Sequence, residues 1–222
     1  TAAAIVCDSD FSASEYHDLI DSNADVNVVH PGVDPRFAAI ARAPDEEPFA
    51  LVVGTVEARK NLLVLVEALP AIPSLRILSV GPFTPYADTV RARAAELGVA
   101  DRVDLRGYVT RTEVDDLYAS ATCALVPSRY EGFGYALAEA MCAGLPVIAA
   151  RSSSLTEVAA NDVPLVPPDD VLAWTDAIAA LLNNRDTAQR RADALRATAA
   201  QRFSWQTAAT KIRQIYTRIK DY

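Results

Sequence analysis

Residues 127–149 read PSRYEGFGYALAEAMCAGLPVIA, and this stretch says most about the fold and chemistry of the chain. It predicts a loop, a helix and a buried strand, with Glu131 on the loop and Glu139 inside the helix. Gly132 and Gly134 allow positive φ and let a ligand approach the main chain closely. The free N–H groups of the first helical turn would then bind an anion. Because Glu139 could accept hydrogen bonds from neighbouring hydroxyls, a phosphate joined to a sugar fits these features.

Each half of this stretch also has a purely structural explanation. A GFG sequence suits a plain tight turn, and a glutamate early in a helix is favoured by the helix dipole alone. The combination, followed by the apolar strand 146–149, favours a ligand site. Glu131 and Glu139 could instead form a general acid and base pair, as in glycosidases, because the sequence gives no distance between them.

Outward from this stretch, short apolar segments alternate with helical segments. Such alternation indicates parallel βαβ units with a sheet buried on both faces. Right-handed crossovers then give an α/β fold with a doubly wound, Rossmann-like parallel sheet. The regular part of this pattern predicts strands at residues 49–53, 76–80, 103–106, 123–126 and 146–149.

Ligands of doubly wound sheets bind beyond the carboxyl ends of the strands. The loops expected there are residues 54–60, 81–84, 107–110 and 128–134, and they contain nearly every cluster of glycine and polar residues in the chain. Neither a GxxxxGK[ST] phosphate loop nor a GxGxxG fingerprint occurs, so ordinary ATPase and dinucleotide-binding functions lose their main support.

The composition limits the partners of the protein. Its net charge of −8 argues against a broad nucleic-acid surface, so we expect no nucleic-acid partner. The sequence has no run of about 18 apolar residues, so we expect no membrane span. Cys7, Cys123 and Cys142 lie far apart, which suits buried thiols in a reducing compartment. With His17 and His30 as the only histidines, a metal cluster is not expected.

Arg59 and Lys60 stand out because lysine is scarce in this chain. They end a strand-to-helix loop at the ligand edge of the predicted sheet, where two cations would contact a phosphate. A solvated loop pair is the alternative, which their place in an acidic protein disfavours. At another strand end, the main chain of Gly107, Tyr108 and Val109 could contact a nucleobase, although a capped turn explains that sequence nearly as well.

Four segments together resemble one known family. Retaining glycosyltransferases of family 4, which have the GT-B fold, are similar in their C-terminal half to GTVEARKN (54–61), LRGYV (105–109), the 127–149 stretch and FSW (203–205). The similarity runs from about residue 28 to the end of the chain. The spacing from Glu131 to Glu139 matches the signature of that family, and the upstream arginine and lysine make the match specific.

The resemblance implies roles for the residues that match the nucleotide site. Arg59 and Lys60 would be the catalytic cations that bind the diphosphate of the donor. Glu139 would accept hydrogen bonds from the ribose hydroxyls. The main chain of Tyr108 and Val109 would contact the base. No metal and no cofactor would be needed beyond the nucleotide sugar, which is the substrate.

The resemblance also implies where the transferred sugar would bind. Glu131 and the main chain around Phe133 and Gly134 would hold its hydroxyls. One departure concerns the phosphates: many relatives carry a further arginine directly after the first-loop glycine, where this chain has Thr55. Phosphate binding is therefore expected to depend on fewer cations.

The resemblance divides the chain into four parts. Residues 1–30 would be the last βα unit of an acceptor-binding domain, 31–48 the interdomain linker, 49–203 the nucleotide-sugar-binding domain, and 204–222 a C-terminal helix that packs back towards the acceptor domain. Met141 is the only methionine, so we expect the chain to be a piece of a longer protein. The rest of the acceptor-binding domain would lie in the missing half.

The function expected from this resemblance is transfer of a sugar from a UDP- or GDP-type donor to an acceptor hydroxyl, in polysaccharide or glycolipid biosynthesis. The sequence leans towards mannosyltransferase-like relatives, and the isolated chain is expected to be inactive. A non-catalytic nucleotide-sugar-binding or regulatory module, and a sugar-nucleotide epimerase, are the alternatives. We expect a cytoplasmic protein, with any attachment to the inner membrane face made through the missing half.

Overall fold

The computed structural model of the protein describes residues 2, 4–21 and 23–220. Its main sheet has six parallel strands in the order β5-β4-β3-β6-β7-β8. The chain enters at the centre, winds outward to one edge, and returns to wind outward to the other. The predicted α/β class with a doubly wound, Rossmann-like sheet is therefore confirmed. The strands are β3 (Phe49–Val53), β4 (Arg76–Val80), β5 (Val103–Gly107), β6 (Cys123–Val126), β7 (Val147–Ala150) and β8 (Leu165–Val166).

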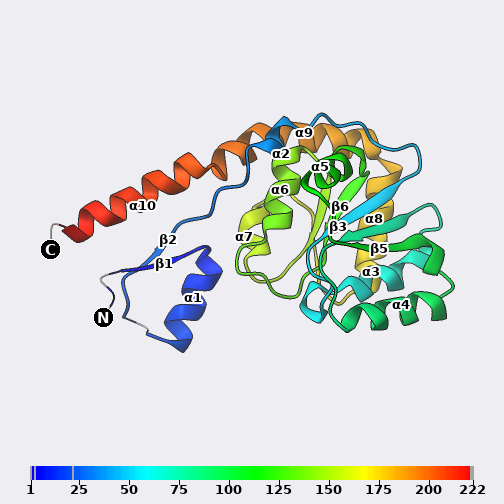
Figure 1. Ribbon diagram of the computed structural model, residues 1–222, viewed down its shortest axis with the longest axis horizontal. Coiled ribbons are helices and arrows are strands. Elements are labelled where there is room, and N and C mark those ends of the chain that lie inside the picture. Colours follow the sequence, from blue (N-terminus) through cyan, green and yellow to red (C-terminus); the bar gives the residue numbers. More distant parts are fainter. Residues whose placement is uncertain (1, 3, 22, 221–222) are drawn as a thin grey trace.

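Helices cover both faces of this sheet (Figure 1). On one face, α3 (Leu62–Ala68) contacts α4 (Tyr86–Glu96) and α8 (Val171–Asn183). On the other, α6 contacts α2, α5, α7 and α9. That second layer comprises α2 (Arg36–Ala39), α5 (Arg111–Ser120), α6 (Tyr135–Ala143), α7 (Leu155–Ala159) and α9 (Arg185–Arg202). Because both faces are covered, the central strands are apolar throughout, as their sequence predicts.

A smaller unit precedes the main sheet. It comprises β1 (Ile5–Cys7), α1 (Asp10–Leu19) and β2 (Val26–Val28), and its two strands pair in parallel. The last helix, α10 (Trp205–Lys220), extends from the main body alongside this unit (Figure 1). Arg218 on α10 donates to Asp25 at 2.7 Å and to Asn27 at 2.8 Å. Residues 1, 3, 22, 221 and 222, which belong to the predicted terminal parts, lie outside the described residues.

The segment 31–48, expected to be a linker, contains the short helix α2. Phe37 on α2 is buried and packs edge-to-face on the Tyr118 ring, with ring centres 4.9 Å apart. Val33 and Ile40 are buried as well. The apolar residues between the prolines therefore attach this segment to the second helix layer. Among the described residues, no helix is both long enough and apolar enough to cross a membrane.

Removal of a single methylene group from this core should lower the stability of the fold by a measurable amount. Ile178 on α8 is 1% exposed, so Ile178→Val should lower the free energy of unfolding by about 1 kcal/mol. Leu172 on the same helix is 76% exposed, and Leu172→Val should change it by less than about 0.5 kcal/mol. Urea unfolding of both variants measures the difference, and equal effects would contradict the packing of α8 against the sheet.

Candidate functional site

The site lies where the strand order reverses. β3 and β6 are neighbours at the centre of the sheet, and the chain leaves them towards opposite edges. A crevice at the carboxyl ends of such strands is the usual ligand site of this architecture. The loop after β3 carries Arg59 and Lys60, and the loop after β6 carries Glu131. The topology therefore brings together residues that are 71 and 72 positions apart.

Arg59 and Lys60 converge on the carboxylate of Glu131. Lys60 Nζ lies 2.5 Å from Oε1, and Arg59 Nη1 lies 3.0 Å from Oε2. The Ser128 hydroxyl also donates to Oε1, at 2.7 Å. Glu131 is only 8% exposed, and burial alone would raise the pKa of its carboxyl. Lys60, Ser128 and Arg59 outweigh burial and lower the pKa, so Glu131 is an ionised group held between two cations.

Arg59 has a second carboxylate partner, because its Nε lies 2.9 Å from Glu57. The arginine side chain is partly exposed, whereas that of Lys60 is largely buried. Two cations thus face two carboxylates, and the group is close to neutral. A phosphate would bind here by sharing these cations with the glutamates.

The loop that presents the two cations is held at both ends. Arg59 and Lys60 lie in a single 3₁₀ turn, Ala58–Lys60, which ends at Asn61. Asn61 is buried in a left-handed conformation with φ of 56°, and its side chain donates to Pro168 O at 2.7 Å. Gly54 has φ of 132°, and a Cβ placed there would lie 3.2 Å from Cε and Nζ of Lys60. The lysine therefore lies directly against the Gly54 main chain.

The N-terminus of α6 opens beside Glu131. Its capping residue, Gly134, has φ of 95° and provides no side-chain cap. A Cβ there would lie 2.6 Å from Cδ2 of the buried Leu155, so only glycine fits this turn without rearrangement. The Phe133 ring is buried between His30, Tyr135 and Phe203, which leaves only its main chain for a ligand.

Glu139 lies in the middle of α6 and is not hydrogen-bonded to the Arg59 group. Its Oε2 accepts a hydrogen bond from the hydroxyl of the buried Tyr118, at 3.0 Å. Burial raises the pKa of Glu139 to about 7, although Tyr118, Arg36 and Lys60 each oppose this rise. The two glutamates of the sequence signature therefore have pKa values shifted in opposite directions.

Tyr108 and Val109 lie in the loop after β5, two strands away from β3. Tyr108 is 84% exposed, and Val109 is half-buried against the core. Two main-chain hydrogen bonds connect their loop to the cation loop: Gly81 N donates to Gly107 O, and Gly54 N donates to Val80 O. Among the described residues, no side-chain hydrogen bond joins Tyr108 or Val109 to Arg59, Lys60 or Glu131.

The residues that orient the two glutamates are not evident from the sequence. Ser128 lies in the 127–149 stretch, but no local pattern names a partner for its hydroxyl. Tyr118 lies on the buried face of α5, where an aromatic residue is expected to pack rather than to hold a carboxylate. A buried tyrosine needs a partner for its hydroxyl, and that requirement was the signal available in the sequence.

A histidine and two acids lie behind the site, although no metal cluster was expected. Asp10, His30 and Glu157 place one ligand atom each within 4.8 Å of one another. The Glu157 carboxylate is already engaged: Oε1 lies 2.8 Å from His30 Nε2 and accepts from Asp10 N at 3.0 Å, and Oε2 accepts from Phe11 N at 3.0 Å. The cluster is explained by hydrogen bonding between the two units.

Comparison with known proteins agrees with this geometry. The family described as glycosyl transferases group 1 matches residues 34–217. A D-inositol 3-phosphate glycosyltransferase from Xylanimonas cellulosilytica is 36% identical over 212 residues, which cover 86% of this chain and 51% of the relative. The chain thus spans about half the length of that curated relative.

Solved structures show the same fold. Sucrose-phosphate synthase from Thermosynechococcus elongatus superimposes with a TM-score of 0.88 at 26% identity, over all of this chain and 59% of that one. HepE from Anabaena, solved with UDP-glucose, gives a TM-score of 0.82 at 21% identity, over all of this chain and 64% of that one. The chain belongs to the glycosyl transferases group 1 family and has the Rossmann-like layer of its GT-B members.

Proposed function

We propose that this chain is the donor-binding half of a retaining glycosyltransferase that uses a UDP- or GDP-type sugar. The observation that carries the proposal is the convergence of Arg59 and Lys60 on Glu131, at the reversal point of the sheet and beside the uncapped N-terminus of α6. A site with cations, amide N–H groups and an ionised carboxylate suits a diphosphate joined to a sugar. The structure of HepE with UDP-glucose supports a ligand of this kind.

In this proposal each group meets one part of the donor. Lys60, Arg59 and the first N–H groups of α6 bind the diphosphate and stabilise the negative charge that grows on it as the sugar departs. Glu131, fixed by Ser128 and Lys60, accepts hydrogen bonds from hydroxyls of the sugar. The bond between the anomeric carbon and the diphosphate oxygen breaks, and the acceptor hydroxyl oxygen bonds to that carbon on the same face, which retains the configuration. The hydroxyl proton passes to the departing diphosphate oxygen.

The nucleoside would bind further along the same edge of the sheet. Glu139, half-buried and aimed at Tyr118, accepts hydrogen bonds from the ribose hydroxyls when it is ionised. The main chain of Tyr108 and Val109 contacts the base. No metal ion is assigned to the diphosphate in this scheme, because protein cations take that position.

The acceptor site belongs to the proposed remainder of the enzyme. The curated relative is about twice as long as this chain, which supports an acceptor-binding unit outside these 222 residues. We therefore expect the isolated chain to bind nucleotide sugars without transferring them. Transfer by the longer protein would separate this proposal from a non-catalytic binding module. Release of an altered sugar nucleotide without any acceptor would indicate an epimerase instead.

A thermal-shift screen of the isolated chain tests the proposed ligand class. A ligand that binds the folded state raises Tm in proportion to RT ln(1 + [L]/Kd). The ligands to be screened are UDP-glucose, UDP-N-acetylglucosamine and GDP-mannose, each compared with its free nucleoside diphosphate. NAD and ATP are the controls. At least one nucleotide sugar should raise Tm more than NAD and ATP do. Equal shifts with all of them, or none, would contradict the proposal.

A further inference from the structure

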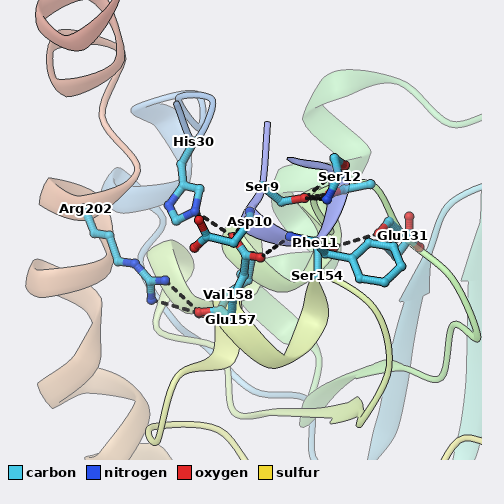
Figure 2. Close-up of polar contacts among 11 residues, drawn as sticks. Ser9, Asp10, Phe11, Ser12, His30, Glu131, Ser154, Glu157, Val158 and Arg202 are labelled. Carbon is cyan, nitrogen blue, oxygen red and sulfur yellow. Dashed lines mark hydrogen bonds and ion pairs between the residues drawn. The ribbon is translucent and has the colours of Figure 1, made fainter. Parts of the chain in front are cut away.

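The loop 131–134 is clamped from two sides (Figure 2). From the main domain, Ser154 donates to the carbonyl oxygen of Glu131 at 2.8 Å, and Ser153 Oγ accepts from Glu131 N at 2.9 Å. From the preceding unit, Ser9 and Ser12 donate to the carbonyl oxygen of Gly132, at 2.5 Å and 3.2 Å. Three successive peptide groups, from the Glu131 N–H to the Gly132 carbonyl, are therefore hydrogen-bonded to hydroxyls. The last of them depends on Ser9 and Ser12, which lie 123 and 120 positions away in the sequence.

Ser9 is placed to act as a rigid donor. It is fully buried and is the N-cap of α1, where its hydroxyl oxygen accepts the Ser12 N–H at 2.9 Å. Its single proton has two acceptors within reach, the Gly132 carbonyl oxygen at 2.5 Å and the Ser12 hydroxyl oxygen at 3.0 Å, and the shorter contact is to the carbonyl. A buried hydroxyl without a hydrogen-bond partner costs free energy, which favours the hydrogen bond from Ser9 to the Gly132 carbonyl.

The N-terminus of α1 is in turn anchored to the main domain. The Glu157 carboxylate accepts the Asp10 and Phe11 N–H groups, each at 3.0 Å, and contacts His30 at 2.8 Å (Figure 2). Arg202 donates to the carbonyl oxygens of Glu157 and Val158 at 2.7 Å and 2.9 Å. These contacts hold the N-terminus of α1, and with it Ser9, against the main domain.

We propose that Ser9 and Ser12 are positioning residues for the donor sugar, acting through the Gly132 carbonyl on the loop 131–134. The inference rests on the proposed function, in which this loop holds the hydroxyls of the sugar. Both serines lie before residues 34–217, which carry the family match, so they extend the donor site into the preceding unit.

The physical reason lies in the freedom of the glycine loop. Gly132 and Gly134 have many accessible backbone conformations, so a loop that contains them needs external contacts to hold one conformation. Loss of the clamp lowers the population of the sugar-binding conformation, and apparent affinity falls by the same fraction. The nucleoside would be held by Glu139 and the loop after β5, neither of which contacts Ser9 or Ser12 through a described hydrogen bond.

The test is calorimetry with Ser9→Ala, using UDP-glucose against UDP and, in parallel, GDP-mannose against GDP. For the pair that binds the unmodified chain, Ser9→Ala should weaken binding of the nucleotide sugar by about 3- to 10-fold, the range expected for one hydrogen bond. Binding of the free nucleotide should change by less than about 2-fold. Ser9→Thr keeps the hydroxyl and should restore the affinity, and Ser14→Ala, exposed on the same helix, should have no effect.

The outcomes separate this inference from the proposed function. Equal weakening of sugar nucleotide and free nucleotide would indicate a general loss of structure and would overturn the inference, as would unchanged affinity for both. Ser12→Ala gives the second measurement if Ser9→Ala does not fold, and a smaller effect of the same selectivity is expected from its longer contact. If the unmodified chain binds neither nucleotide sugar, both the inference and the proposed function fail.

Discussion

Lys60→Ala is expected to weaken the affinity of the chain for the proposed nucleotide sugar by about 10- to 100-fold, which corresponds to one lost charge-assisted hydrogen bond to phosphate. The lysine is largely buried and lies 2.5 Å from Glu131, so it cannot be replaced by a neighbouring cation without movement of the loop. In the longer enzyme that we propose, the loss of rate should be larger, because the charge on the leaving diphosphate is greatest in the transition state.

The same substitution should also destabilise the folded chain. It leaves the buried Glu131 with Arg59 and Ser128 as its remaining partners. Removal of one partner from a buried ion pair costs about 3–5 kcal/mol, and because Arg59 remains we expect about 2 kcal/mol here. Urea unfolding measures this loss in the absence of nucleotide.

Lys211→Ala is the matched control for both measurements. It removes the same charge from an exposed position on α10 and should change neither affinity nor stability by a measurable amount. A Lys60→Ala variant that binds nucleotide sugar as tightly as the unmodified chain would refute the assignment of the diphosphate site.

Glu139→Gln should make the folded chain more stable at pH 8, and at pH 4 it should leave the stability nearly unchanged. The pKa of Glu139 is about 7 in the folded state, above its ordinary value of 4.5. The protonated group therefore favours folding below about pH 4.5, and this stability is lost as the pH rises through 7. The amide stays neutral and still accepts the Tyr118 hydrogen bond. We expect a gain of about 1–3 kcal/mol at pH 8, measured by urea unfolding across the pH range.

Nucleotide affinity should change in the opposite direction. Two hydrogen bonds from ribose hydroxyls are stronger to a carboxylate than to an amide, so Glu139→Gln should bind about 10- to 100-fold more weakly at pH 8. In the unmodified chain, affinity should rise between pH 6 and pH 8 as Glu139 ionises. A variant with the same affinity and the same pH dependence as the unmodified chain would contradict the ribose assignment.

The parts of the fold that follow from local sequence were predictable. Five strands of the main sheet have ends within one residue of those predicted. A short apolar segment bounded by turn residues is typical of a buried strand, so these elements could be located from local sequence. Their parallel order then places Arg59, Lys60 and Glu131 at one edge. The site could be predicted to this extent since topology, rather than side-chain detail, brings its loops together.

The remaining features depend on contacts between distant residues. Glu131 and Lys60 could be assigned to the same edge, but their direct ion pair could not be predicted because sequence carries no distances. The contact between Ser9 and Gly132 joins two units, and neither residue has a local pattern that names its partner. Likewise, the sequence of the proline-rich segment 31–48 does not show whether the segment is an exposed linker or packs on the core. In the structure, Phe37 of this segment packs on Tyr118.

The most direct test of the diphosphate site is a crystal structure of the chain soaked with the nucleotide sugar that gives the largest thermal shift. We expect both phosphorus atoms beside Lys60 and the first N–H groups of α6, with the sugar against the loop 131–134. Phosphorus atoms bound anywhere else on the molecule would contradict the assignment.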